Sequence, residues 1–265
     1  HNLDIHGDTA CLATVDGNYI ALNLNTGSIE WQVFLRKGIR TGKPEFIDGQ
    51  ILFNAMSYDK NDRPYCSFLC LDLFTGALIK EIRTEMWWES LSIRSGNIVV
   101  ASSWEKIYAI DLAKGGKYLW EVKDKDGDDV EGDPVIAGNL VYQAFKTKVA
   151  AYEVTTGKKL WSTRYPWELD ARTENDQYNY AFPRELQVKD HLLLAGPLAL
   201  DKLTGKVVWQ VKITDKNTIH PGLFRDRYLY LPVGKTIMKI EALTGNVAWT
   251  AKRKEDDFKL LDIQA

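Results

Sequence analysis

Six copies of one short phrase, spread along the whole chain, predict an all-β fold: a β-propeller of six blades, each with four antiparallel strands. The phrase joins an apolar residue to Asp, Asn or Glu, then places a glycine turn four or five residues later, and in most copies a Trp four residues after the glycine. Successive copies lie 40 to 49 residues apart, with glycines at Gly27, Gly76, Gly116, Gly157, Gly205 and Gly245. At 265 residues, with 45% hydrophobic and 26% charged residues, the chain is expected to form one domain, residues 1–265.

Each position of the phrase has a structural reason. The apolar residue ends a half-buried strand of alternating pattern. The acid or Asn that follows can accept hydrogen bonds from the amides of the next turn, and the glycine can adopt a positive φ. The Trp falls on the outer strand, where it can pack against the neighbouring blade and bury up to ~250 Å². Further hairpin turns are predicted at Asp48-Gly49-Gln50, Ser95-Gly96-Asn97 and Ala137-Gly138-Asn139.

The second copy departs from the pattern, because Lys80 stands where the Trp is expected. In the same copy, Cys70 occupies a column that holds Ala21, Ala109, Ala151 and Ala199 in four other copies, which predicts a small buried residue. Cys11, Cys66 and Cys70 make an odd number at spacings that define no disulfide framework. They are therefore expected to be reduced thiols in the core.

The phrase A-x-D-x-x-T-G-x-x-x-W resembles the PQQ-like repeat. That repeat occurs in quinoprotein dehydrogenases and in the propeller lipoprotein of the outer-membrane β-barrel assembly machinery. Known relatives often have seven or eight blades, so a complete six-bladed ring and part of a larger ring are both open. The resemblance favours a bacterial cell envelope or periplasm, whereas three cysteines without a predicted pairing favour a reducing compartment such as the cytoplasm.

The resemblance to quinoprotein dehydrogenases is limited to the repeat. Those enzymes hold their cofactor against an adjacent Cys-Cys pair, with a calcium bound by acid and amide side chains. No two cysteines are adjacent in this chain, which is also far shorter than those enzymes. We therefore expect no PQQ, no other cofactor and no enzymatic activity. The net charge of −2 gives no reason to expect nucleic acid, and no apolar run approaches the roughly 20 residues of a membrane span.

One acidic segment is a weak candidate for a cation site. Oxygen ligands at this density can hold calcium. The order of residues does not match an EF-hand, however, and a solvated acidic loop between two blades is the simpler interpretation. No bound metal is expected. The candidate ligands are Asp124, Asp126, Asp128 and Glu131.

Each link between strands lies at one of the two ends of a blade. When the links are sorted by these ends, the pattern predicts a binding rim at one of them. One end is predicted to carry only tight turns. The other carries two long insertions, residues 57–65 and 165–185, together with every Trp that does not belong to the repeat. Such aromatics can fill the mouth of a propeller, but flanked by arginines they are more typical of an interaction surface. The predicted rim residues are Trp87, Trp88, Trp104, Trp167, Tyr58, Tyr178, Tyr180, Arg63 and Arg172.

The function that these observations favour is a non-enzymatic scaffold that binds a protein partner through its aromatic rim. An immunity-type protein that caps a toxin would be a special case of such a scaffold. A carbohydrate-binding propeller is the main alternative, because flat aromatic faces suit sugar rings. A degenerate quinoprotein-like enzyme is the third, and it would need titratable groups that converge in the channel.

Overall fold

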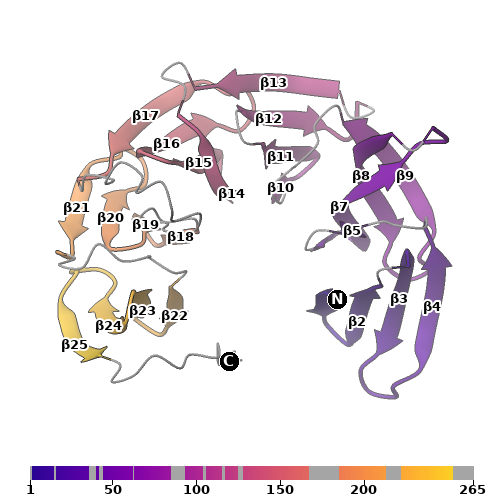
Figure 1. Ribbon diagram of the computed structural model, residues 1–265, viewed down its shortest axis with the longest axis horizontal. Helices are drawn as coiled ribbons and strands as arrows, with labels where there is room; N and C mark the ends of the chain where they lie inside the picture. The colour runs from indigo at the N-terminus through magenta and orange to yellow at the C-terminus, as the bar shows by residue number, and fades with distance from the viewer. Residues whose placement is uncertain are drawn as a thin grey trace. The chain divides into compact units, whose positions relative to one another are not determined.

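The computed structural model describes residues 2–14, 16–35, 40–41, 44–61, 63–84, 93–103, 106–114, 117–124, 128–166, 185–212 and 222–252. The regular structure in these ranges consists of β-strands, arranged in six antiparallel sheets whose strands follow one another in chain order (Figure 1). The predicted all-β propeller of six blades is confirmed. Within the same ranges, no helix has the length and apolar character needed to cross a membrane.

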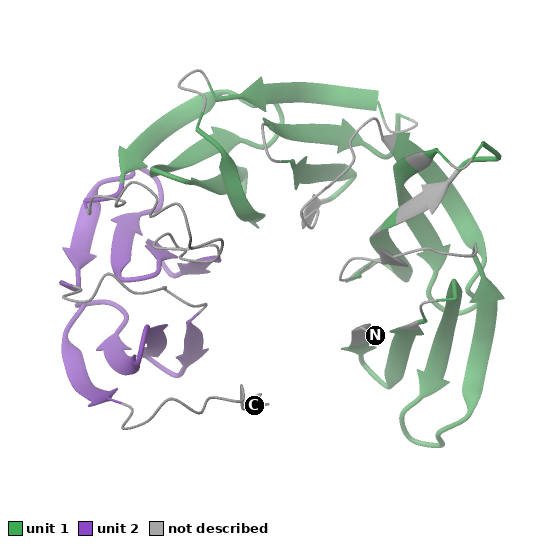
Figure 2. Ribbon diagram, in the orientation of Figure 1, with its two compact units in different colours: residues 1–164 green, residues 165–265 purple. Residues whose placement is uncertain are grey.

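The chain divides into two compact units, residues 1–164 and 165–265 (Figure 2). The expectation that residues 1–265 are one domain stays a prediction. The first unit contains four sheets. The first sheet consists of β1 (Asn2–His6), β2 (Thr9–Ala13), β3 (Asn18–Asn23) and β4 (Ile29–Phe34). The second consists of β5 (Arg40–Thr41), β6 (Glu45–Ile47), β7 (Gln50–Tyr58), β8 (Pro64–Asp72) and β9 (Leu78–Thr84). Here β5 and β6 both pair with β7 and share the innermost position.

The third to sixth sheets have four strands each. The third consists of β10 (Ile93–Ser95), β11 (Ile98–Ser102), β12 (Lys106–Asp111) and β13 (Lys117–Lys123). The fourth consists of β14 (Val130–Ala137), β15 (Leu140–Phe145), β16 (Lys148–Glu153) and β17 (Lys159–Arg164). The second unit holds the fifth sheet, β18 (Leu186–Lys189), β19 (Leu192–Ala195), β20 (Leu198–Asp201) and β21 (Val207–Gln210). It also holds the sixth, β22 (Leu223–Arg225), β23 (Tyr228–Val233), β24 (Thr236–Glu241) and β25 (Val247–Lys252).

The turn of the repeat is built in the same way in successive sheets. In the second sheet, Asp72 Oδ1 accepts hydrogen bonds from the amides of Phe74 (3.0 Å) and Thr75 (2.8 Å). The amide of Gly76 then donates to the carbonyl of Asp72 at 2.9 Å. The glycines of five copies have φ between 68° and 74° and donate equivalent bonds, so their predicted equivalence is confirmed: Gly27, Gly76, Gly157, Gly205 and Gly245.

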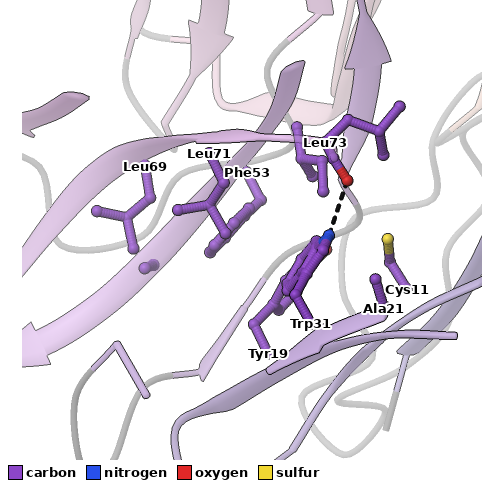
Figure 3. Close-up of a cluster of buried hydrophobic side chains, with 10 residues drawn as sticks. Cys11, Tyr19, Ala21, Trp31, Phe53, Leu69, Leu71 and Leu73 are labelled. Atoms are coloured by element: carbon purple, nitrogen blue, oxygen red, sulfur yellow. Dashed lines mark hydrogen bonds between the residues drawn. The ribbon is translucent and has the colours of Figure 1, made fainter. Parts of the chain in front are cut away.

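The repeat tryptophans join one sheet to the next. Trp31 Nε1 donates to the carbonyl oxygen of Leu73 in the second sheet at 2.8 Å (Figure 3). Trp120 and Trp209 make the same bond, to Val154 at 2.7 Å and Ala242 at 2.8 Å. These three side chains are only 8% exposed, which confirms the predicted packing against the next blade. Trp249 differs, because 43% of its surface is exposed where burial was predicted.

The second sheet makes its joint without a tryptophan. The ammonium group of Lys80 donates to the carbonyl oxygen of Leu112, the counterpart of the acceptors used by the tryptophans. Cys70 is buried in the small-residue column as predicted, and Cys11 and Cys66 are buried thiols outside any disulfide. Burial raises the pKa of the Cys11 thiol to about 11, so this sulfur stays protonated and unreactive near neutral pH.

Candidate functional site

Each sheet has two structurally different ends. The end with the link between the second and third strands also carries the link to the next sheet, and we call it the loop end. The opposite end is the turn end, where the described links are short. Asp48 and Gly49, for example, form a two-residue hairpin turn with φ of 52° and 72° between the paired residues Ile47 and Gln50. Tight turns at this end agree with the prediction, and the predicted binding residues belong to the loop end.

The hairpin of β7 and β8 is the longest feature of the loop end. Its two strands have nine residues each, whereas the corresponding strands of the other sheets have four to six. At about 3.4 Å per residue, three additional residues extend the hairpin by ~10 Å. Pairing continues to the last pair, Tyr58 and Pro64. Residues 57–58 and 64–65 of the predicted insertion therefore continue the sheet as paired strands.

The tip of this hairpin is held by Asp59. Its Oδ1 accepts hydrogen bonds from the amides of Asn61 (2.7 Å) and Arg63 (2.9 Å), and its own amide donates to the carbonyl of Arg63 (2.8 Å). These amide bonds, chiefly the one from Arg63, lower the pKa of the Asp59 carboxyl. The Arg63 side chain is exposed beside this fixed turn. The turn thus presents a cation on a defined backbone.

A second cation lies beside this hairpin, on the neighbouring strand β9. The guanidinium carbon of Arg83, on β9, lies 4.3 Å from the centre of the Tyr65 ring on β8, and Arg83 Nε is 3.9 Å from Glu81. A guanidinium stacked in this way loses less freedom when a partner binds. Neither residue was predicted as part of the site. Their contact depends on how β8 and β9 lie side by side, and no local sequence pattern indicates it.

Most of the predicted rim residues lie outside the part of the chain that the structure describes. For Tyr58 the structure describes the backbone in β7 but not the side chain. The convergence of the aromatic side chains on one face therefore stays a prediction. The residues that lie outside the described part are Trp87, Trp88, Trp104, Trp167, Arg172, Tyr178 and Tyr180.

A buried ion pair lies at the loop end of the fourth sheet. Lys148 Nζ donates to Asp124 Oδ2 at 2.8 Å, with side-chain exposures of 5% and 3%. The Lys148 ammonium also lies 5.6 Å from the centre of the Phe145 ring. Removing one member of such a pair leaves a buried charge uncompensated, which typically costs about 3–5 kcal/mol. The pair therefore fixes the segment that enters the fourth sheet.

The described residues of the acidic segment, the weak calcium candidate, are hydrogen-bonded to β15, to β16 and to the link between them. Asp128 Oδ2 accepts from the amide of Thr147 (3.1 Å) and from its hydroxyl (2.6 Å), and the amide of Lys146 donates to the carbonyl of Asp129 (3.0 Å). Glu131 contributes its backbone carbonyl, which accepts from Gln143 Nε2 at 3.1 Å. Two of the four candidate carboxylates, those of Asp124 and Asp128, are thus occupied by protein donors. Asp126 lies outside the described residues, so the calcium interpretation stays untested.

Comparisons with known proteins come from sequence and from structure. The sequence matches the family model described as outer membrane protein assembly factor BamB over residues 16–176 and 195–263. No curated protein sequence matches the chain significantly.

Several solved structures share the fold. BamB from Moraxella catarrhalis is 15% identical, over 93% of this chain and 71% of that one, with a TM-score of 0.64. Sqt1 from Saccharomyces cerevisiae is 12% identical, over 92% and 70%, with a TM-score of 0.67. A quinohemoprotein alcohol dehydrogenase from Pseudomonas putida HK5 is 12% identical, over 94% and 58%, with a TM-score of 0.62. Since these proteins differ in what they do, the likeness establishes the fold and leaves function to the residues of the site.

Proposed function

The chain belongs to the family of the outer membrane protein assembly factor BamB, and we propose that it is a non-enzymatic scaffold that binds a protein partner through the loop end of its sheets. The observation that carries the proposal is the extended β7–β8 hairpin. Its tip is held by Asp59 and presents the exposed side chain of Arg63. The family resemblance adds support, because a BamB protein is named as an assembly factor.

The hairpin has the properties of a preformed recognition element. Its strands remain paired up to the turn, so little backbone freedom is lost when a partner binds. Arg, Tyr and Trp side chains dominate the energetics of protein interfaces. Arg63 and Tyr65 on the hairpin, and Arg83 on the neighbouring β9, supply this chemistry. The four loop-end tryptophans of the sequence would extend it.

The cysteines of this chain do not fit the quinoprotein cofactor. Cys66 and Cys70 are four residues apart on β8 and both are buried, so they cannot form the adjacent pair that lies against PQQ. Among the residues that the structure describes, no group of three or more His, Cys, Asp or Glu side chains is arranged to hold a metal ion. We therefore derive no redox step and propose a binding function.

The proposal is tested by affinity capture from the source organism followed by binding measurements. We expect a protein partner whose affinity falls about tenfold or more for at least one of the variants Trp87→Ala, Trp104→Ala, Trp167→Ala and Arg63→Glu. Phe74→Ala and Leu203→Ala are matched controls, because these side chains are 75% and 65% exposed at the turn end. Normal binding by all four loop-end variants would contradict the proposal.

Two other outcomes would identify the alternatives. Binding to a glycan panel, without a captured protein, would indicate a carbohydrate-binding propeller. Capture of a toxin whose activity is blocked would indicate the immunity-type case. We propose a bacterial cell envelope location, which cell fractionation with an antibody against the chain would test against the cytoplasm.

A further inference from the structure

The joint between the third and fourth sheets has polar side chains in its core. In the part of the chain that the structure describes, five polar or charged residues are buried, and four of them lie at the loop end of these two sheets. Asp124 and Lys148 form the ion pair described above. The other two are Ser102, at the end of β11, and Gln143, on β15, and both are 0% exposed. Because buried polar groups are costly without partners, these two must be satisfied within the joint.

Gln143 and Ser102 lie on the two faces that meet in this joint. Side chains two residues apart share a face of a strand, so Gln143 lies on the face of Phe145, which packs with Val100 of the third sheet. By the same rule, Ser102 shares the face of Val100 on β11. The Ser102 hydroxyl donates to the carbonyl oxygen of Gly132, on β14 of the fourth sheet, at 3.4 Å. The two polar side chains therefore face the same boundary from opposite sheets.

A bulge in β14 fixes the orientation of the Gln143 amide. The register of β14 and β15 shifts between Glu131 and Val135, so that residues 132–134 lie opposite Gln143 alone. Gln143 Nε2 donates to three backbone carbonyl oxygens, each at 3.1 Å. Exchange of the two ends of the amide would place its oxygen against these three oxygens, so the structure determines which end is which. The acceptors belong to Glu131, Gly132 and Ala144.

The oxygen of the same amide is enclosed in the joint. Gln143 Oε1 is buried and accepts no hydrogen bond from any residue in the described ranges. Buried oxygens of this kind are nearly always satisfied by a protein donor or by an ordered water molecule. Two neighbouring residues are small, since Gly132 has no side chain and the cross-strand partner of Gln143 on β16 is Ala150. The surroundings of Oε1 therefore favour a small hydrogen-bond donor beside the amide.

We propose that this joint binds one ordered water molecule, which donates to Gln143 Oε1 and also contacts the Ser102 hydroxyl. Ser102 suits the second role because it contacts the same Gly132 carbonyl as the Gln143 amide, and its bond there is long. A metal ion does not suit the site, because it would need several oxygen ligands and the three carbonyls accept from Nε2. The water bridges β11 and β15 and so ties the third sheet to the fourth behind the bulge of β14. The site is separate from the hairpin of β7 and β8, so it stands independently of the proposed function.

The experiment combines a high-resolution crystal structure of the full chain with magnetic relaxation dispersion of water oxygen, which counts the water molecules held inside a protein in solution. In the crystal we expect a water peak about 2.7–3.2 Å from Gln143 Oε1. In solution we expect Ser102→Val to hold one long-lived water fewer than the unmodified chain, because a methyl group replaces the hydroxyl that the water contacts. Ser103→Val is the matched control, since Ser103 is the next residue and is only partly buried. It should keep the full number of long-lived waters.

Three results would overturn the proposal. A crystal structure in which a protein group donates to Gln143 Oε1, or in which no peak lies beside it, would show that no water is bound there. An equal number of long-lived waters in Ser102→Val and in the unmodified chain would show that no water bridges the two sheets at Ser102. The same loss in Ser103→Val as in Ser102→Val would show that the substitutions loosen the third sheet in general. The crystal structure of the unmodified chain decides the question even if Ser102→Val does not fold.

Discussion

The joint between the first and second sheets and the joint between the second and third sheets use different side chains for the same bond. In the first joint the Trp31 indole donates to Leu73 O and stacks against Tyr19, which in turn stacks on Phe53. In the second joint Lys80 donates to Leu112 O. The buried cluster there includes Ile82, Phe68 and Tyr108.

The difference separates two roles that the tryptophan combines. One role is to satisfy the backbone carbonyl that follows the acid of the next repeat turn. The other is to fill the space over the glycine of that turn. Lys80 fills the first role, so satisfaction of the carbonyl is the feature common to the two joints. A buried carbonyl without a donor costs about 1–3 kcal/mol, which explains why a donor is present in both.

The largest expected effect is loss of the indole itself. Trp31→Ala removes both the hydrogen bond to Leu73 and the packing of a large core side chain, and should lower the free energy of unfolding by about 3–5 kcal/mol. Trp209→Ala should behave alike, because its burial and its bond to Ala242 are equivalent. Urea unfolding of the two variants checks this. Unchanged midpoints would show that the joints contribute little to stability.

The glycine under the indole gives a matched pair of substitutions. A Cβ added to Gly76 would lie 2.5 Å from Trp31 Cε3, whereas a Cβ on Gly27 would meet nothing within 4 Å. The two residues have φ of 70° and 71°, so the backbone strain of an alanine is the same. Gly27→Ala should cost about 1 kcal/mol and Gly76→Ala about 2–4 kcal/mol, because only the latter displaces the ring. Equal unfolding midpoints for the two variants would contradict the packing described.

The lysine joint should be more tolerant. Lys80→Met keeps most of the side-chain volume and removes the donor to Leu112 O, at an expected cost of about 1 kcal/mol. Lys80→Arg retains a donor and should cost less than Lys80→Met. Chemical denaturation of both variants measures the difference. A loss as large as that of Trp31→Ala would mean that Lys80 does more than satisfy one carbonyl.

The smallest expected effect is on the pH dependence of stability. This dependence should differ between the repeat turn of the first sheet and that of the second. The hydroxyl and amide of Thr75 donate to Asp72 and lower the pKa of its carboxyl. The first sheet has Asn23 at this position, and its Oδ1 accepts from the amides of Asn25 and Thr26 without titrating. Because the folded pKa of Asp72 is below its unfolded value of about 3.9, its contribution is present above that pH and is lost as the pH falls through the folded value.

Asp72→Asn should therefore reduce the difference between urea midpoints measured at about pH 5 and about pH 3, and Asn23→Asp should increase it. Asp201, which has the same contacts with Thr204 and a lowered pKa, serves as a second test position. An unchanged pH dependence in both Asp→Asn variants would show that these turn contacts do not contribute to acid sensitivity.

The fold could be predicted from the sequence because the repeat encodes local geometry. The Thr-Gly turn requires a positive φ, and the acid before it supplies the acceptor that the turn needs, so six copies at one period define six similar sheets. The joints were predicted only in part. The tryptophans indicated packing against a neighbour, but the carbonyl acceptor of each indole lies 33 to 42 residues away and has no signature of its own.

The candidate site was much harder to predict. The position of the long hairpin followed from the spacing of the repeats, whereas the fixed turn at Asp59 and the stacked Arg83 depend on geometry. The acidic segment looked like a solvated loop or a cation site, and its true partner at Asp124 is Lys148. Lys148 precedes the apolar run Val149-Ala150-Ala151 in a buried strand, and a lysine at the edge of such a run could have indicated a buried acid nearby.

The hydrogen bonds of the indoles also determine how long each indole lacks its acceptor while the chain is being synthesised. The acceptor of Trp31 is 42 residues further along the chain, and at about 5–20 residues per second a ribosome needs about 2–8 s to add them. During that time the first sheet can form its own hydrogen bonds, but its indole has no carbonyl to bind. The same wait recurs for Trp120 and Trp209, whose acceptors lie 34 and 33 residues downstream. A pause in translation just after a tryptophan-bearing strand therefore prolongs the exposure of that indole, and faster translation shortens it.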